Sequence, residues 1–325
     1  MPPLVSVIIP AYESECYLDR CLQSLARQTY HRLEAIVIDD GSKDGTPRIA
    51  DEFAERRPLE NVLVIHQENR GAAASRNKGI DIAHGELLFF LDADDYLDDD
   101  CIETYVRAQQ KYGCDVVCGG YRRPDAEGVV RGEVRIEPES EWACYSMTAG
   151  CAKLYRTEYV RSRGFRFLEG VAFGEDLFFT IPALSAASSV KTMPYVGYDY
   201  YLNEASASSN VTSSAGQEFD RLISLILDEE VRAGVEVEGI LLHVFVRMAA
   251  WYLFYTSRGD SGEEVRKNYE AFVNLLNQRL PTWRSDCFAR LGHPTGDALK
   301  SKVATWLFVR HPHLFLMALK AYGRH

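Results

Sequence analysis

Three aspartates follow an apolar run in the sequence F-F-L-D-A-D-D, residues 89–95. Side chains two apart on an extended segment point the same way, so Asp92 and Asp94 can converge on one point just beyond a strand. Carboxylate oxygens in such an arrangement suit Mg2+ or Mn2+. A solvated acidic loop is the common alternative for an isolated D-x-D, because acidic residues are frequent in turns. The elements around Asp92, Asp94 and Asp95 must decide between the two.

The first third of the chain alternates strand and helix signals. We predict strands at residues 4–9, 33–38, 62–65 and 87–91, and helices at 16–28, 46–57 and 72–83 between them. The strands are apolar throughout, which indicates a mostly parallel, Rossmann-like sheet with helices on both faces. The fold class is therefore α/β.

A polar signature follows each of these four strands. In chain order the signatures are Pro10-Ala11-Tyr12, Asp39-Asp40-Gly41-Ser42, Asn69-Arg70-Gly71 and Asp92-Ala93-Asp94. The carboxyl ends of parallel strands meet at one edge, where open α/β sheets bind their ligands. Four signatures at that edge favour a ligand site over a solvated acidic loop.

Composition excludes several other classes. The net charge of -11 and the pI near 5.3 argue against a nucleic-acid binder. No G-x-G-x-x-G follows the first strand and no P-loop motif occurs, which disfavours dinucleotide dehydrogenases and P-loop enzymes. The eight cysteines include no C-x-x-C and are expected to be reduced, packed thiols. The N-terminal residues lack the features of a signal peptide or membrane anchor, so we expect a cytoplasmic protein.

The second half has a different pattern. Residues 121–139 form an extended excursion, compatible with a hairpin or a loop, and strands are expected at 190–193 and 195–202. Helices are expected at 157–163, 175–187, 217–233, 239–256 and 262–279, followed by a segment that Pro312 interrupts. Residues 206–214 form a Ser/Asn-rich linker. We therefore predict a catalytic domain at 1–214 and a helical C-terminal region at 215–325.

The chain end is basic and aromatic. After Asp297 it has no acidic residue but carries Lys300, Lys302, Arg310, Lys320 and Arg324 among aromatic and aliphatic side chains. This composition suits peripheral contact with an anionic membrane, which would place the protein at the inner face of the cell membrane. A terminal helix that packs back on the protein is an equally good interpretation. The sequence also leaves a homo-oligomer open.

The ordered segments V-S-V-I-I-P-A-Y, E-A-I-V-I-D-D-G-S-K-D-G-T, N-R-G-A-A-A-S-R-N-K-G-I and F-L-D-A-D-D resemble the signature of family 2 glycosyltransferases with the GT-A fold. The resemblance covers roughly residues 4–202 and is to bacterial enzymes that build capsule, exopolysaccharide or teichoic-acid decorations. It implies an inverting, metal-dependent hexosyl- or N-acetylhexosaminyltransferase. The donor would be a UDP-sugar and the acceptor a glycan or lipid-linked sugar.

The resemblance also implies roles for individual residues near the nucleotide. Tyr12 would stack on the uracil ring and Asp40 would accept its N3 hydrogen, with backbone contacts from Pro10 and Ala11. Asp39 would instead support the following turn. The remaining nucleotide-sugar contacts expected from matching positions are Glu13, Asn69, Gly71, Arg76, Asn77, Asp92, Ala93 and Lys153. Glu13 stands where relatives usually carry Asn.

The same resemblance assigns the metal and the base. Asp94 would bind Mn2+ or Mg2+ directly, and Asp92 would reach the metal or the ribose. Gly174-Glu175-Asp176 matches the family's E-D motif, so Asp176 would be the catalytic base and Glu175 would contact acceptor or donor sugar. Acids at a helix start can also simply favour the helix dipole. The basic residue that often follows the tyrosine-rich strand is missing here, and Asn203 or Ser206 could stand in for it.

Two other functions use similar residues. A phosphohydrolase could use Asp92 as a nucleophile. The phosphohydrolase motif, however, usually carries Thr or Val where this chain has Tyr96, and it follows the first strand, whereas the motif of this chain follows the fourth. A nucleotide-sugar-binding scaffold without turnover is disfavoured by the presence of Asp92, Asp94 and Asp176 together.

Overall fold

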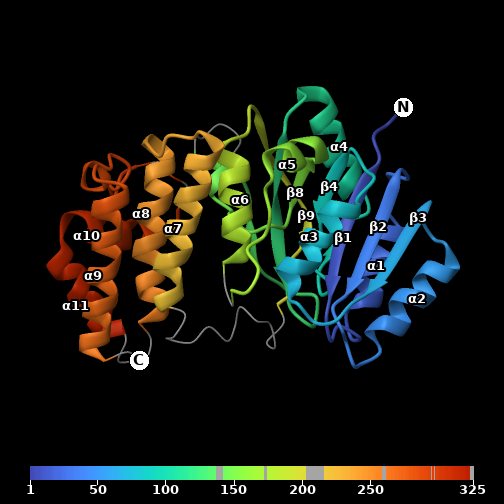
Figure 1. Ribbon diagram of the computed structural model, residues 1–325, viewed down its shortest axis with the longest axis horizontal. Helices are drawn as coiled ribbons and strands as arrows, with labels where there is room; N and C mark the ends of the chain where they lie inside the picture. The colour runs from blue at the N-terminus through green and yellow to red at the C-terminus, as the bar shows by residue number, and fades with distance from the viewer. Residues whose placement is uncertain are drawn as a thin grey trace. The chain divides into compact units, whose positions relative to one another are not determined.

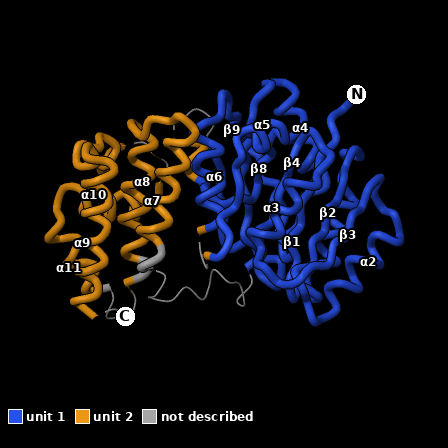
Figure 2. Tube along the Cα trace, in the orientation of Figure 1, with its two compact units in different colours: residues 1–138, 147–170, 175–206 blue, residues 139–146, 171–174, 207–325 orange. Residues whose placement is uncertain are grey.

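The computed structural model describes residues 1–136, 142–171, 174–202, 216–257, 261–293, 295 and 297–322. The chain divides into two compact units (Figure 2). The first consists of residues 1–138, 147–170 and 175–206, and the second of residues 139–146, 171–174 and 207–325. The expected linker at 206–214, with Asn203 and Ser206, lies outside the described residues.

The first unit is built on a nine-stranded sheet of order β3-β2-β1-β4-β8-β6-β9-β5, with β7 paired to β6. Figure 1 labels β1 to β4, β8 and β9 of this sheet. The strands are β1 (Val5–Ala11), β2 (Leu33–Asp39), β3 (Asn61–His66), β4 (Leu87–Phe90), β5 (Tyr96–Leu97), β6 (Val116–Pro124), β7 (Val130–Val134), β8 (Lys153–Arg156) and β9 (Val190–Asp199). Strands β1 to β4 are mutually parallel, as predicted. Strand β8 is antiparallel to both β4 and β6, so the far half of the sheet is mixed.

Side-chain alternation on the central strands separates two helical layers. Val5, Val7 and Ile9 of β1 face a core shared with α1 (Leu18–Ala26), α2 (Thr46–Arg56) and α4 (Cys101–Tyr112). Ile8 faces the other layer, where α3 (Ala72–Ile82) crosses β1 so closely that a Cβ at Gly79 would lie 2.4 Å from Ile8 Cγ2. Glycine at position 79 therefore allows α3 to pack this closely against β1. The predicted cover of helices on both faces is confirmed.

Two further helices belong to the first unit. They are α5 (Thr157–Arg163) and α6 (Glu175–Ser185). Helix α6 packs through Phe179. Its ring stacks on that of Phe167, with 4.3 Å between the ring centroids, and meets the ring of Phe90 of β4 edge-on, with 5.5 Å between the centroids. This aromatic cluster fixes the start of α6 near the carboxyl end of β4.

Several elements differ from the sequence-based expectation. Helix α4 and strands β6 and β8 were not predicted, and residues 190–202 contain one strand where we expected two. In β9 the register to β6 runs from Cys118↔Thr192 to Gly120↔Val196, so two extra residues are absorbed on β9. Pro194, which has no amide hydrogen to donate, lies in this bulge. The strand therefore continues past the proline.

The second unit is helical. Its helices are α7 (Gly216–Ala233), α8 (Gly239–Thr256), α9 (Gly262–Arg279), α10 (Leu299–Arg310) and α11 (Pro312–Tyr322), with a 3-10 turn at Trp283–Ser285. The rings of Phe219 and Tyr252 stack in its core. Helix α9 begins with a capping box between Ser261 and Glu264. Among the described residues, no helix is long and apolar enough to cross a bilayer.

Candidate functional site

Asp40 organises the turns that follow β2 and β3. Its Oδ1 accepts hydrogen bonds from Gln67 Nε2 (2.7 Å) and the Arg70 amide (3.0 Å), and its Oδ2 accepts from the Gly71 amide (2.7 Å). The residue is 2% exposed. A carboxylate has about four acceptor positions, so Oδ2 keeps capacity for one more donor. Asp40 is thus both a structural anchor and a preformed acceptor.

The neighbouring Asp39 has a different structural role. It caps the turn by accepting from the Ser42 amide at 3.1 Å, and its other oxygen lies 2.9 Å from Nδ1 of His66. Gly41, between this pair of acids and Ser42, has φ 78°, and a Cβ there would lie 2.9 Å from the Asn69 amide nitrogen. Only glycine fits this close approach of the two turns.

The loop after β1 is interlocked with the loop after β2. The amides of Glu13, Ser14 and Glu15 donate to side-chain oxygens of Ser42, Thr46 and Asp44, at 2.7–3.0 Å. In return, the carboxylate of Glu13 accepts from the Lys43 amide at 2.8 Å. Glu13, predicted to contact the nucleotide, therefore uses one carboxylate oxygen to hold the two loops together.

Tyr12 and its neighbours stand at the end of β1. The Ala11 carbonyl accepts from the Asp40 amide at 2.8 Å, which joins the ends of β1 and β2. Pro10 and Ala11 are buried, whereas Tyr12 is 50% exposed. Asn69 is also exposed, and Gly71 adopts φ 89° before α3. The structure thus gathers the residues predicted around the base at one sheet edge, with the ring of Tyr12 open to solvent.

Arg76 of α3 connects the acidic motif to the start of α6. Its Nη2 donates to Asp92 Oδ1 at 2.7 Å, and its Nη1 lies 3.3 Å from Glu175 Oε1 and 3.4 Å from Asp176 Oδ1. The guanidinium lies over the ring of Phe167, 5.2 Å from its centroid. Burial alone would lower the pKa of Arg76, but the three carboxylates outweigh it and raise the pKa well above its usual value.

Asn77, which we expect to face the nucleotide, is hydrogen-bonded within the protein. Its Nδ2 donates to the Phe167 carbonyl (2.9 Å) and to Glu169 Oε1 (3.1 Å), and its Oδ1 accepts from the Phe167 amide (2.8 Å). All its hydrogen-bonding groups are engaged, because an amide offers two donor hydrogens. In this structure Asn77 pins the segment that leads toward α6.

Lys153 also differs from the expectation of a sugar or phosphate contact. Its side chain is fully buried on β8, and its Nζ donates to the Ala149 carbonyl at 2.6 Å. The ammonium therefore lies below the surface of the site, where it holds a backbone turn.

The three aspartates of the acidic motif have separate surroundings. Asp92 and Asp94 are partly exposed, whereas Asp95 is 1% exposed. Asp95 accepts from the Tyr198 hydroxyl (2.6 Å) and from the Tyr201 amide (2.8 Å). Burial, with Asp92 and Asp94 nearby, raises the pKa of Asp95 well above its usual range. Asp95 is thus an inward anchor, and Asp92 and Asp94 face outward.

Two residues that support this motif, Tyr198 and Arg20, were not predicted from the sequence. Tyr198 also accepts from the Asp92 amide at 3.3 Å, and Arg20 donates to the Asp94 carbonyl at 2.8 Å. The Arg20 guanidinium lies between the rings of Tyr96 and Tyr201, 4.4 and 4.3 Å from their centroids. The short pairing of β5 with β9 brings Tyr198 and Tyr201 close to the motif, and no local sequence pattern signals it.

Glu175 and Asp176 begin α6, as predicted. Burial and the adjacent Asp176 raise the pKa of Glu175, and Arg76 partly offsets this. Asp176 Oδ2 accepts from the Gly150 amide at 3.2 Å. Its Oδ1 is a buried atom with no hydrogen-bond partner among the described residues. Oδ1 therefore has an ion-pair contact, at 3.4 Å from Arg76 Nη1, but no hydrogen bond within the described part of the chain.

The donor set can be tested for a divalent cation. Among the described residues no cluster of three or more His, Cys, Asp or Glu side chains could hold a metal by itself. Asp95 is turned inward, and one oxygen of Asp92 is bound to Arg76. Asp94 and the second oxygen of Asp92 offer hard carboxylate oxygens. They fit Mg2+ or Mn2+ that is also held by substrate phosphates and water, the usual arrangement for Mg2+.

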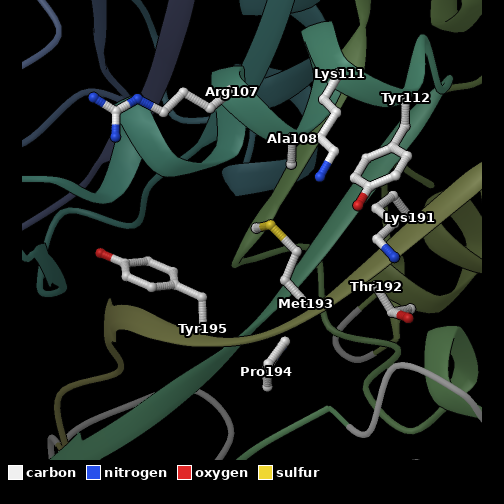
Figure 3. Close-up of a pocket in the computed structure, with 9 residues that line it drawn as sticks. All are labelled: Arg107, Ala108, Lys111, Tyr112, Lys191, Thr192, Met193, Pro194 and Tyr195. Atoms are coloured by element: carbon white, nitrogen blue, oxygen red, sulfur yellow. The ribbon is translucent and has the colours of Figure 1, made fainter.

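A separate pocket of about 600 Å³ lies between α4 and β9, lined by basic and aromatic side chains that include Lys111, Tyr112 and Lys191 (Figure 3). It adjoins the beginning of β9, whereas Tyr198, which supports the acidic motif, lies near the end of that strand. None of the predicted site residues lines it. The pocket is therefore distinct from the carboxylate site.

Comparison with known proteins identifies the family. The sequence profile described as Glycosyl transferase family 2 matches residues 6–186, more than half of the chain. The chain is 42% identical over 117 residues to "Putative glycosyltransferase EpsH" of Bacillus subtilis, a match covering 36% of this chain and 33% of the relative. It is 31% identical over 216 residues to "Uncharacterized glycosyltransferase EpsJ" of the same organism, covering 62% of each. The chain thus spans less than two thirds of these relatives.

Solved structures show the same fold. The crystal structure of residues 1–349 of Staphylococcus aureus TarS in complex with UDP-GlcNAc has a TM-score of 0.73 at 22% identity, covering 99% of this chain and 90% of that one. A mannosyltransferase from Pyrobaculum calidifontis, in complex with GDP-Man and Mn2+, has a TM-score of 0.57 at 18% identity and covers 100% and 86%. The residues of the carboxylate site lie within the matched range, residues 6–186. The chain belongs to glycosyl transferase family 2.

Proposed function

We propose that this protein is an inverting, metal-dependent glycosyltransferase that moves a hexosyl or N-acetylhexosaminyl group from a UDP-sugar to a glycan or lipid-linked acceptor. The observation that carries the proposal is the Arg76 cluster, in which one guanidinium lies within 3.4 Å of oxygens from Asp92, Glu175 and Asp176. Carboxylates suited to a metal and to a base are thereby held side by side, next to the Asp40 turn. Such an arrangement serves the departure of a phosphate and the arrival of a hydroxyl.

The uracil is proposed to lie between Tyr12 and Asp40. The half-exposed ring of Tyr12 offers a stacking face, and Asp40 Oδ2 retains one acceptor position for the N3 hydrogen. Because the turns around Asp40 are already hydrogen-bonded, nucleotide binding would require little reordering of the backbone. The UDP-GlcNAc complex of TarS supports a UDP-sugar as the donor class.

The diphosphate is proposed to lie over Asp92 and Asp94. A divalent cation bound there would neutralise the negative charge that collects on UDP as the glycosyl bond breaks. Arg76 keeps Asp92 in place, and Asp95 with Tyr198 fixes the backbone of the turn from below. The protein's contribution is thus a preorganised pair of carboxylates.

Asp176 is proposed to be the base. The acceptor oxygen forms a bond to the anomeric carbon while its proton passes to Asp176 Oδ1, and the bond from that carbon to the phosphate oxygen breaks, with the electron pair leaving on UDP. Attack from the side opposite the leaving group inverts the anomeric configuration. Asp176 Oδ1 makes no hydrogen bond among the described residues and lies 3.4 Å from Arg76 Nη1, so it retains acceptor capacity for this proton.

The biological setting is proposed from the relatives. EpsH and TarS are a putative glycosyltransferase and a "Poly(ribitol-phosphate) beta-N-acetylglucosaminyltransferase", respectively. We infer an acceptor belonging to cell-surface polysaccharide synthesis. Peripheral membrane contact through α10 and α11 would bring the enzyme to such acceptors, and Leu314 and Met317, 51% and 67% exposed, offer an apolar surface for it.

The decisive experiment separates binding from transfer. UDP release from UDP-GlcNAc and other UDP-sugars is measured with Mn2+ or Mg2+, and UDP affinity is measured by thermal shift. Asp176→Asn should lower turnover by about 10²- to 10⁴-fold, the range typical of a general base, and leave UDP affinity within about twofold. Asp19→Asn, a change at an exposed acid of α1, is the control and should behave as wild type. Loss of UDP binding in Asp176→Asn, or full turnover, would refute the assignment.

A further inference from the structure

The fully buried ammonium of Lys153 lies next to the turn that contacts Asp176. Lys153 Nζ donates to the Ala149 carbonyl at 2.6 Å and more distantly, at 3.4 Å, to the Cys151 carbonyl. The Gly150 amide donates to Asp176 Oδ2 at 3.2 Å. A buried ammonium is costly unless it is well hydrogen-bonded, so its presence under this turn calls for a functional reason.

The two hydrogen bonds share a single peptide group. The carbonyl of Ala149 and the amide of Gly150 belong to the same planar unit, in which a trans peptide points C=O and N–H in opposite directions. When Lys153 holds the carbonyl from one side, the amide hydrogen must point to the other side, where Asp176 lies. The ammonium also polarises the peptide and strengthens its donor end.

The turn around this peptide is itself constrained. Ala152 adopts φ 51°, a conformation uncommon for a residue other than glycine, and its carbonyl accepts from the Tyr105 hydroxyl (2.9 Å) and the Gly119 amide (3.1 Å). A Cβ added to Gly150 would lie 3.2 Å from Asp176 Oδ1. The backbone therefore touches the carboxylate closely, and a rotation of this peptide would move or release it.

We propose that Lys153 is a positioning residue for glycosyl transfer, which acts through the 149–150 peptide to orient the carboxylate of Asp176. This inference rests on the proposed role of Asp176 as the base. The hydrogen bond from Gly150 engages Oδ2, so that Oδ1, which makes no hydrogen bond to the described residues and lies 3.4 Å from Arg76 Nη1, can take the acceptor proton. Lys153 itself touches no substrate, which fits its complete burial.

Lys153→Met tests the proposal, because methionine fills similar volume without a donor. Turnover should fall about 10- to 100-fold, as small misplacements of a catalytic group do, while the KM for UDP-sugar and the affinity for UDP stay within about twofold. The matched control is Tyr105→Phe, which removes one of the two donors to Ala152 but leaves the 149–150 peptide untouched. It should keep wild-type turnover even if urea denaturation shows a loss of stability.

The Gly150 amide provides a second measurement that does not depend on enzyme activity. In glycine-labelled protein, the Gly150 amide signal and its hydrogen exchange should change in Lys153→Met and in Asp176→Asn, and should stay as in wild type in Tyr105→Phe. An unchanged Gly150 amide in Lys153→Met overturns the proposal. Equal loss of turnover in Tyr105→Phe also overturns it, because the effect would then be general loosening. If wild-type protein releases no UDP from any UDP-sugar, the proposed function fails, whereas the amide measurement still shows whether Lys153 orients the 149–150 peptide.

Discussion

Arg76 Nη2 lies 2.7 Å from Asp92 Oδ1 and joins α3 to the turn that follows β4. The same guanidinium also approaches Glu175 and Asp176 at the start of α6. One buried cation thus compensates three carboxylates that would otherwise repel one another. Its removal should affect stability as well as catalysis.

We expect Arg76→Met to lower the free energy of unfolding by about 3 kcal/mol. This is the lower end of the cost of removing one partner of a buried ion pair, because the three carboxylates, 27–31% exposed, retain contact with water. Urea denaturation measures the change. Arg76→Lys, which keeps the charge, should recover part of it. A loss below about 0.5 kcal/mol in Arg76→Met would show that the carboxylates do not depend on this cation.

We expect Tyr12→Ala to weaken UDP binding by about 1–3 kcal/mol, the usual contribution of a base stacked on an aromatic ring. This corresponds to roughly 5- to 150-fold in Kd, measurable by titration calorimetry. Tyr12→Phe keeps the ring and should bind UDP nearly as wild type does. Equal affinity in both variants would place the base elsewhere.

The stability of the Asp39 turn should depend on pH through His66. The hydrogen bond to Asp39 raises the pKa of His66, burial lowers it in part, and Asp51 at 3.2 Å raises it further. Because the folded-state pKa lies above the unfolded value of about 6.5, this stabilisation is fully present below that pH. It is lost as the pH rises through the folded-state pKa.

His66→Gln should therefore flatten the fall in unfolding free energy above pH 6.5, measured by urea denaturation at a series of pH values. The effect should be modest, since the ring is 45% exposed. His31→Gln, at an exposed histidine, is the control and should follow the wild-type curve. A wild-type slope in His66→Gln would contradict the assignment.

Peripheral membrane contact through α11 can be tested without truncation. Leu314→Ser with Met317→Ser changes two exposed residues and spares Phe315 and Leu319, which are buried. Co-sedimentation with vesicles of phosphatidylglycerol and phosphatidylcholine should decrease clearly. Val231→Ser, at another exposed apolar position, should have no effect. Undiminished binding of the double variant would refute the membrane proposal.

The sequence predicts those helices and strands that local sequence patterns encode. Strands β1 to β4 are short apolar runs followed by Gly-, Asp- or Asn-containing turns, and α7 to α9 show helical periodicity, so both sets are recognisable without a partner. Strands β6 and β8 are not, because β8 is only four residues long and takes its place from pairing with β4 and β6. Whether such a segment becomes a strand depends on its pairing with strands that are distant in the sequence.

The same distinction holds for the site. The structure places Tyr12, Asp40, Arg76, Asp92 and Asp176 where the motifs led us to expect chemistry, although their roles remain predictions. The burial of Lys153 and the pairing of Asn77 with Phe167 could not be read from the chain. Each depends on a neighbour whose position is fixed only after the sheet has formed, and a polar residue type alone does not reveal whether it faces a ligand or a backbone turn.

The hydrogen bonds of Asp40 and Asp95 differ greatly in the length of chain they close. Asp40 binds residues 27–31 positions away, whereas Asp95 is held by Tyr198 and Tyr201, more than 100 positions later. Closing the longer loop costs more entropy and depends on β9. As the chain is synthesised, the turns around Asp40, which we propose to bind the nucleotide, can therefore form before Asp95 is anchored to Tyr198 and Tyr201. The contacts proposed for the uracil base would then be in place before the backbone of the acidic turn is anchored.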